Sequence, residues 1–204
     1  MTYAVRPVRA EEWREARELR LASLRDPLAH LAFLDTYEEA AARPDAHWRG
    51  RTERAAAGAG SGARQFVAVG PDGRWVGTVT ALLERQGGDV PLGEPAEVDQ
   101  THVVGVYVRP GARGSGVAEA LLRAAVQWSW SLREPVVRRV RLYVHERNAR
   151  AAALYRKAGF APSGVVISLE RGSEPGEAGA VEVEYELLRS GASADVAEGA
   201  GAGA

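Results

Sequence analysis

The spacing of apolar residues in the first third of the chain predicts one strand followed by two helical stretches. Thr2–Val8 alternates apolar and polar residues, as a strand with one buried face does. Ala10–Arg25 is rich in the helix formers Ala, Leu, Glu and Arg and ends at Asp26-Pro27. Thr36–Ala57 predicts further helix, interrupted at Pro44 because proline cannot continue a helix beyond its first turn.

The middle of the chain predicts a hairpin and then a long loop. Two strand-like runs, Arg64–Val69 and Arg74–Leu83, flank Gly70-Pro71-Asp72-Gly73, a sequence that favours a tight turn. Glu84–Gln100 contains several glycines and prolines and predicts a loop. Loops of this length inside a compact domain are often functional.

The second half predicts a strand–helix–strand crossover. Its expected elements are a strand over Thr101–Val108, a helix over Gly114–Ser131, a strand over Val136–Val144, a helix over Asn148–Ala158, and strands over Val165–Glu170 and Val181–Leu188. A crossover of this kind joins parallel strands, whereas hairpins join antiparallel ones. We therefore expect an α/β protein of the α+β mixed-sheet kind, with a central, mostly antiparallel sheet and helices on both faces.

The composition fits one globular domain and excludes several kinds of site. The chain has 204 residues, 46% of them hydrophobic, which suffices for a single domain, assigned to residues 1–189. Residues 190–204 have almost no bulky apolar side chain and predict a disordered tail. The absence of cysteine excludes disulfides, thiolate metal sites and a cysteine nucleophile. The four histidines lack metal-ligand spacing, so no metal site is expected.

Charge and hydropathy give no reason to expect a nucleic-acid or membrane partner. The formal net charge is −1, which produces no strong global field. The N-terminus lacks the apolar core of a signal peptide. The longest apolar run, Val103–Val108, is far too short to cross a bilayer. We expect a cytoplasmic protein.

The segment Val106–Ala118 has the make-up of an anion site. It leads from a strand through glycines into a helix, whose first N–H groups and partial positive charge favour an anion. Arg113 adds a formal positive charge. Val117-Ala118 replaces the lysine and hydroxyl residue of a Walker loop, and Glu119 occupies the position of the third glycine of a dinucleotide fingerprint. Both nucleotide interpretations therefore fail.

The same turn resembles a motif of the GNAT superfamily of acyl-CoA-dependent N-acyltransferases. Arg113, Gly116 and Ala118 match its pattern Gln/Arg-x-x-Gly-x-Gly/Ala, and the strand before the turn resembles the family's strand. The resemblance implies acetyl-CoA as co-substrate. It implies binding of the pantetheine arm along Val106, Tyr107 and Val108, and of the pyrophosphate by Arg113, Gly114, Ser115, Gly116, Val117 and Ala118. The alternative is an ordinary strand–helix turn with glycines for packing.

A second motif, Asn148–Phe160, matches the GNAT pattern Asn-x-x-Ala-x-x-Leu-Tyr-x-x-x-Gly-Phe without a departure. The resemblance implies that Asn148 contacts the cofactor and that Tyr155 protonates the departing CoA thiolate as a general acid. Taken alone, Tyr155 could belong to an apolar core stripe and Asn148 could be a helix N-cap only. The two motifs in order, on the expected elements, favour an enzyme with a GNAT-like fold.

The general base is the least determined part of the expected site. In the family this group lies near the strand before the glycine turn. Counting back by twos from Val108 places His102 on the same strand face as Val106. An unperturbed imidazole has a pKa of about 6.5, which suits a base at neutral pH. We hypothesise that His102 is the base, directly or through water, with Glu97 and Asp99 as rivals.

The sequence does not select the acceptor amine. A small molecule, an amino acid, a peptide N-terminus and a protein lysine all fit. By resemblance, Leu28–Trp48 and Glu84–Gln100 form the acceptor side. Acidic residues in these segments would favour a cationic amine, although charged runs more often form a solvated surface.

Two further hypotheses stay open from the sequence. A non-catalytic CoA-binding or sensory module on the same fold is the competing function, and the intact Tyr155 argues against it. A homodimer is considered, formed through the last strands or the surface around Trp128 and Trp130.

Overall fold

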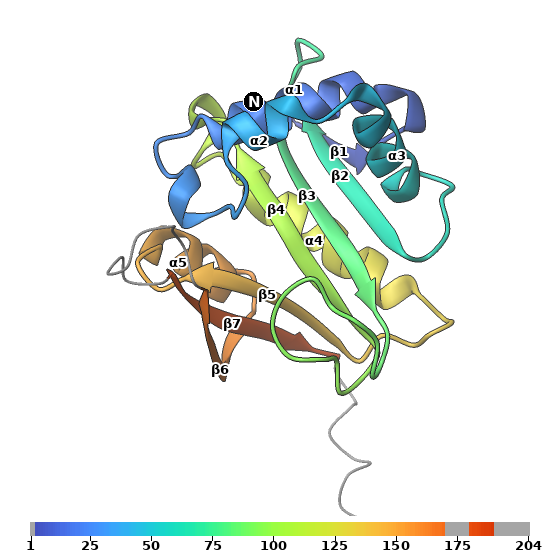
Figure 1. The fold of residues 1–204 in the computed structure, drawn as a ribbon, viewed down its shortest axis with the longest axis vertical. Helices are drawn as coiled ribbons and strands as arrows, with labels where there is room; N and C mark the ends of the chain where they lie inside the picture. Colours follow the sequence, from blue (N-terminus) through green and yellow to red (C-terminus); the bar gives the residue numbers. More distant parts are fainter. Residues whose placement is uncertain (1–2, 170–179, 190–204) are drawn as a thin grey trace, which may run out of the picture.

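The computed structural model describes residues 3–169 and 180–189 (Figure 1). The first part of the chain forms β1 (Ala4–Pro7), the 3₁₀ turn η1 (Ala10–Glu12), α1 (Trp13–Leu24), the 3₁₀ turn η2 (Ala29–Leu31), α2 (Tyr37–Ala42) and α3 (Asp45–Ala55). The rest forms β2 (Ala63–Val69), β3 (Trp75–Glu84), β4 (Gln100–Val108), the 3₁₀ turn η3 (Pro110–Ala112), α4 (Val117–Ser131), β5 (Arg139–His145), α5 (Ala149–Lys157), β6 (Ala161–Leu169) and β7 (Ala180–Leu188). The expected disordered tail and the link between the last two strands lie outside the described residues.

The seven strands form one mixed sheet in the order β1-β2-β3-β4-β5-β7-β6. β4 and β5 run parallel, and each of the other neighbouring pairs is antiparallel. The parallel pair is joined through α4, as the predicted crossover requires. The predicted mixed, mostly antiparallel sheet is therefore confirmed.

β4 and β5 pair at one end only. Gln100–His102 lies beside Arg139–Arg141, and no further pairs follow along the two strands. Beyond this point the strands diverge, as Figure 1 shows. The divergence leaves the later part of β4 without a strand neighbour on that side and creates space inside the sheet.

β4 also contains a bulge, which overturns the expectation that His102 shares a face with Val106 and Val108. Thr80 lies opposite Val104, but Thr78 lies opposite Tyr107, so β4 has one extra residue here. Gly105, within the bulge, has φ +64°, a conformation that glycine adopts without strain.

The buried clusters show the change of face directly. Val103 and Val108 are an odd number of residues apart, yet both pack in the cluster under α4, whereas Tyr107 packs in the cluster on the other face. His102 contacts Glu84 on the face away from α4. Counting by twos failed because it assumes a regular strand.

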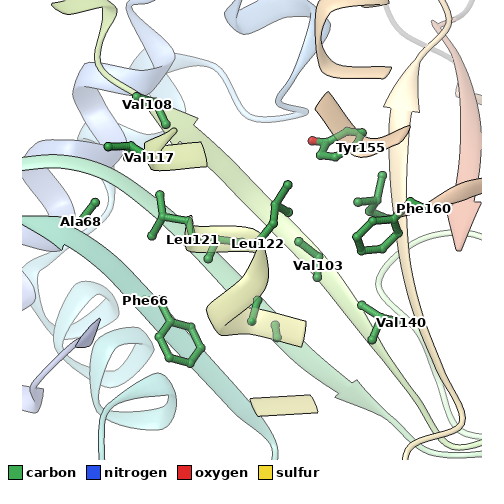
Figure 2. Close-up of a cluster of buried hydrophobic side chains, with 14 of the residues drawn as sticks. Phe66, Ala68, Val103, Val108, Val117, Leu121, Leu122, Val140, Tyr155 and Phe160 are labelled. Atoms are coloured by element: carbon green, nitrogen blue, oxygen red, sulfur yellow. The ribbon is translucent and has the colours of Figure 1, made fainter. Parts of the chain in front are cut away.

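Helices cover both faces of the sheet. α4 and α5 pack on one face, where Leu121 and Leu122 lie against β-strand residues such as Val103 (Figure 2). Each of these leucines is at most 1% exposed, and burial of such a side chain stabilises the fold by about 1.5–3 kcal/mol. On the other face, Leu19 of α1 and Trp48 of α3 pack over β2 and β3.

The helical stretch Thr36–Ala57 breaks where the sequence predicts. Arg43 is extended, with ψ 135°, because a residue before proline is disfavoured in the helical conformation. Pro44 is then the N-cap of α3. A capping box that the pattern analysis missed begins α2: Glu39 N–H donates to the Thr36 hydroxyl, and Thr36 N–H donates to the Glu39 carboxylate.

Several element boundaries differ from the prediction, among them the starts of α4, β5 and β6. α4 begins at Val117 rather than Gly114, because Gly114 and Gly116 take left-handed conformations that a helix cannot include. β5 begins at Arg139 rather than Val136. β6 begins at Ala161 and includes Pro162, which an edge strand tolerates because the missing N–H need not enter a ladder.

Candidate functional site

A cavity of about 830 Å³ opens where β4 and β5 diverge. Its walls come from the loop after α1, from His102–Val108 of β4, from the glycine turn, and from the inner face of α5. The predicted site residues that line it are His102, Val106, Tyr107, Val108, Arg113, Gly114, Gly116, Ala118, Asn148 and Tyr155. Its size is in the range of cofactor sites. Two motifs separated along the chain therefore meet around one cavity.

The glycine turn presents the start of α4 to this cavity. Gly114 has φ +79° and Gly116, the N-cap residue, has φ +84°. The first N–H groups of a helix have no partner within it, and they carry a partial positive charge. The first bond of α4 within its own backbone is donated by Ala120 to Gly116. This geometry suits an anion held by backbone amides.

Two predicted turn residues do not line the cavity. The Ser115 hydroxyl donates to the carbonyl of Ala112 over 2.6 Å. Val117 is 3% exposed and packs in the core beneath α4. Their side chains stabilise the turn, so any contact with an anion is left to their backbone N–H groups.

The positive charge of Arg113 is already neutralised, contrary to the expectation that it adds charge to the turn. Its guanidinium forms an ion pair with Asp26, whose side chain is 4% exposed, and its Nε donates to the Val108 carbonyl over 3.0 Å. The pair fixes the loop after α1 against the turn. The backbone amides of the turn carry no such counter-charge, and Arg113 itself still lines the cavity.

Tyr155 lies on α5 with its ring packed against Phe160 and Tyr185. The side chain is buried, yet it lines the cavity. Burial raises the pKa of the Tyr155 phenol well above its ordinary value, and the negative charge of Glu182 raises it further. The phenol therefore stays protonated at neutral pH and holds the proton that a general acid needs.

Asn148 is both a helix cap and a link to the opposite wall. Its side-chain oxygen accepts from Ala151 N–H over 3.1 Å, which confirms the N-cap. Its amide nitrogen donates to the carbonyl of Leu31 over 3.3 Å. Asn148 thus connects α5 to the loop that covers the cavity.

His102 forms a buried pair with Glu84, a residue that the sequence analysis did not single out. The distance between His102 Nδ1 and Glu84 Oε1 is 3.1 Å, and both side chains are at most 3% exposed. Burial raises the pKa of Glu84, but the His102 ring, Gln100 and Arg141 lower it more, so the net shift is downward. A carboxylate on one ring nitrogen orients the imidazole and leaves the other nitrogen for a proton.

The two rival bases lie elsewhere. Glu97 is exposed, and the Asp99 carboxylate accepts from Gln86 N–H over 3.2 Å. Neither is among the described residues that line the cavity. Only pairing across the sheet could have indicated Glu84, because Leu82 lies opposite His102 and Glu84 follows on the same face of β3.

A buried arginine holds Glu84, the partner of His102, in place. Arg141, 1% exposed, lies between Glu84 and Glu184, with Nε 2.8 Å from Glu84 Oε2 and Nη1 3.1 Å from Glu184 Oε2. It also donates to the carbonyls of Leu92 and Glu94 in the loop before β4. One guanidinium therefore fixes the His102 partner and a loop at the cavity wall.

The acidic residues expected on the acceptor side do not line this cavity as a group. Glu38, Glu94 and Glu97 are exposed to solvent, and Glu39 caps α2. Asp35 does line it, but this carboxylate is paired with two arginines. The acids of these two segments therefore form no wall that would select a cationic amine; the other described acidic residues that line the cavity are Asp26, Glu119 and Glu182, from other elements.

Residues 3–169 and 180–189 show neither a metal-binding group of side chains nor a membrane-spanning helix. Those residues contain no group of three or more His, Cys, Asp or Glu side chains that could hold a metal ion. None of the helices described there combines the length and the hydropathy needed to span a bilayer.

Known structures share this fold. The acetyltransferase of the GNAT family from Streptococcus pneumoniae aligns with a TM-score of 0.71 at 15% identity, over 92% of this chain and 100% of that chain. NAA60 of Arabidopsis thaliana in complex with acetyl-CoA aligns with a TM-score of 0.64 at 18% identity, over 92% and 98% of the two chains. At these identities the likeness concerns the fold alone.

Curated relatives share part of the sequence. A mycothiol acetyltransferase of Beutenbergia cavernae is 44% identical over 70 residues, which are 34% of this chain and 22% of that protein. One of Cellulomonas flavigena is 36% identical over 101 residues, 49% of this chain and 27% of that protein. The chain thus spans about a quarter of the length of these relatives.

Membership of a family rests on the longest sequence match. The model of the acetyltransferase (GNAT) family matches residues 13–160, which include the glycine turn and the whole of the second motif. This range is well over half of the chain. The chain therefore belongs to the GNAT family of acetyltransferases, as its two motifs predict.

Proposed function

We propose that this chain transfers an acetyl group from acetyl-CoA directly to an amine within a ternary complex. Family membership supplies the class of reaction and the donor. The observation that carries the proposal is the meeting of the glycine turn, the unpaired part of β4 and Tyr155 around one cavity. Such a cavity can hold the two ends of acetyl-CoA and leave its thioester beside a proton donor.

The donor is proposed to lie along β4. The amides of the glycine turn and of the first turn of α4 would hold the pyrophosphate. Because β5 diverges after His102, the backbone groups of Val106–Val108 on that side have no partner in β5 and would pair with the pantetheine arm, except for the Val108 carbonyl, which accepts from Arg113 Nε. Asn148 lines the cavity as well and would contact the same cofactor.

The chemistry requires two proton movements. The amine nitrogen forms a bond to the acetyl carbon, and the C–S bond of the thioester breaks. His102, oriented by Glu84, takes the proton that the amine loses, directly or through water. Tyr155 gives its proton to the CoA thiolate. Afterwards His102 releases a proton to solvent and Tyr155 regains one from it. Atoms and charges balance, since one proton leaves the amine and one reaches the sulfur.

Replacement of Tyr155 by Phe tests the assignment of the general acid. We expect kcat to fall by about 100-fold, because acid catalysis contributes about 10²–10⁴-fold and a CoA thiolate is already a fair leaving group. Acetyl-CoA affinity, measured by calorimetry, should stay within about twofold, since only one oxygen is lost. Because burial raises the pKa of Tyr155, the wild-type kcat should show no loss on the mildly alkaline side from ionisation of this phenol.

Tyr185 provides the matched control. It is a buried neighbour of Tyr155, and it does not line the cavity. Tyr185→Phe should leave kcat near the wild-type value. If Tyr155→Phe were as active as Tyr185→Phe, Tyr155 would be a core residue only. A wild-type protein that binds acetyl-CoA but acetylates no amine would instead support the non-catalytic module.

Replacement of His102 by Ala tests the base. We expect a fall in kcat/KM of about 100-fold, the lower end of base catalysis. Glu97→Ala is the control, because Glu97 is exposed and away from the cavity. If His102→Ala kept the kcat/KM of the wild type while Glu97→Ala were inactive, the assignment of the base would be reversed.

A further inference from the structure

Two arginines from different helices line the cavity beside the bulge of β4. Arg20 comes from α1 and Arg51 from α3. Both also line a small adjoining pocket over Gly105, whose other walls include Thr78 and Thr80 of β3. A Cβ atom added to Gly105 would meet nothing within 4 Å, so the space above the bulge is open.

The charges in this corner do not balance. Arg20 stacks on Phe33, with 4.4 Å from its guanidinium carbon to the ring centre, and donates to Asp35 over 3.1 Å. The same carboxylate accepts from Arg43 over 3.2 Å. The hydrogen bonds and ion pairs found among the described residues include none for Arg51. We call Arg20, Arg43, Arg51 and Asp35 the arginine cluster; it has three cations and one anion.

The pKa shifts of Arg51 and His47 reflect the same excess of positive charge. Burial lowers the pKa of Arg51, and the charges of Arg20, Arg43 and Arg54 lower it further, against Asp35 alone. The pKa of His47 is lowered first by burial and then by Arg43 and Arg51. A half-buried guanidinium without a counter-ion is stabilised by any anion that reaches it, and its planar fork matches a carboxylate.

This corner is separate from the proposed pyrophosphate site. Gly105 precedes the end of β4 at Val108 by three residues, about 10 Å of extended chain, and the glycine turn begins only after that. The anion sites at the two places are thus served by different donors, the start of α4 and the arginine cluster. His102 and Tyr155 line the same cavity as Arg51, so an acceptor bound by Arg51 would share this cavity with the reacting thioester.

We propose that the acceptor is a small amine that carries a carboxylate, such as a free α-amino acid, and that Arg51, supported by Arg20, binds this carboxylate. This inference rests on the proposed acetyl transfer and names the class of its acceptor. The carboxylate is unchanged in the reaction: its role is to fix the amine nitrogen opposite the acetyl carbon. The acidic composition of Leu28–Trp48 and Glu84–Gln100 favours an acceptor that is purely cationic. The proposal instead gives the acceptor an anionic group, its carboxylate.

The test compares acceptors that differ only in charge. Initial rates are measured with a panel of free α-amino acids, each paired with its carboxamide, at saturating acetyl-CoA. We expect at least one free acid to be acetylated with kcat/KM about 10- to 100-fold above its amide, because hydrogen bonds to a charged group are the strong ones. In Arg51→Gln this preference should collapse through a higher KM for the acid, with KM for acetyl-CoA unchanged.

Arg54→Gln is the matched control, since Arg54 is exposed on the same helix and the substitution removes the same formal charge. It should keep the preference for the free acid. Arg51→Lys should recover part of it, because a point charge replaces the bidentate fork. Equal use of acid and amide by the wild type, or an Arg51→Gln defect confined to acetyl-CoA, would overturn the proposal.

Binding separates this inference from the proposed function. The same acids and amides are titrated calorimetrically into the CoA-bound wild-type protein. Binding of an acid that Arg51→Gln loses, together with absence of any acetylated product, would support the carboxylate site and contradict the transferase. Binding of neither acid nor amide, or of both alike, would contradict the carboxylate site whether or not some other amine is acetylated.

Discussion

Gly116→Glu should abolish measurable acetyl-CoA binding by calorimetry, a loss of about 100- to 1000-fold in affinity. Gly116 has φ +84°, where a residue with a side chain is strained by about 1–3 kcal/mol. The new carboxylate would also lie at the start of α4, where the pyrophosphate is proposed to bind, and would repel it. The repulsion acts on the donor, and neither effect removes a core contact, so the variant should still fold and keep its far-ultraviolet circular dichroism.

Gly111→Glu is the control for added bulk and charge. Gly111 is exposed, a Cβ atom there would meet nothing within 4 Å, and its φ is outside the left-handed region. It does not line the cavity. Affinity for acetyl-CoA should stay within about threefold of the wild type. Equal affinities for Gly116→Glu and the wild type would show that the donor phosphates bind elsewhere.

The parts of the site that the sequence predicts are those that local chemistry determines. Glycines at Gly114 and Gly116 indicate a turn with left-handed residues, and the structure places both in that conformation. Asn148 at the start of an apolar helical stripe indicates an N-cap, and it caps α5. Such features depend on neighbours within a few residues, so a single sequence contains them.

The parts that sequence reasoning missed depend on distant pairing. The Arg113–Asp26 ion pair joins residues 87 positions apart, and the His102–Glu84 pair needs the register of β3 against β4. Nothing local determines either. The acceptor corner is similar, because Arg20 and Arg51 meet only through the packing of α1 and α3 over the sheet.

The bulge in β4 has a local sequence signal, but the signal was not used. A glycine inside a strand pattern is a known sign of a bulge, and Gly105 occupies that position. Counting by twos nevertheless assumed a regular strand. The error moved His102 to the wrong face, although it remained a residue of the cavity.

Arg141→Met should destabilise the protein by about 3–5 kcal/mol in urea unfolding at neutral pH. The substitution keeps most of the apolar stem but leaves Glu84 and Glu184, which are 2% and 1% exposed, without the guanidinium between them. Removal of one partner from a buried ion pair leaves an uncompensated charge, which is much more costly than removal of the whole pair. The lost hydrogen bonds to Leu92 and Glu94 should also loosen the loop before β4.

The pH dependence identifies the cause. In the wild type the net pKa shifts of Glu84 and Glu184 are downward, despite burial, because of their hydrogen bonds and nearby arginines. Their stabilisation is therefore complete above the ordinary glutamate range near pH 4.3 and is lost as the pH falls through the lowered values. In Arg141→Met the carboxyls protonate more easily, so the difference from the wild type should shrink as the pH falls.

A second substitution distinguishes unpaired charge from lost packing. Arg141→Met combined with Glu184→Gln removes one of the stranded carboxylates and should recover about 1–2 kcal/mol, a coupling typical of residues in one network. Glu184→Gln alone should be destabilising, because Arg141 and Tyr143 both donate to this carboxylate. Two results would contradict a network that fixes His102 and the loop as a unit. One is a loss of less than about 1 kcal/mol in the free energy of unfolding of Arg141→Met. The other is a loss in the double variant equal to the sum of the losses in the two single variants. The base would then have to be positioned by the strand alone.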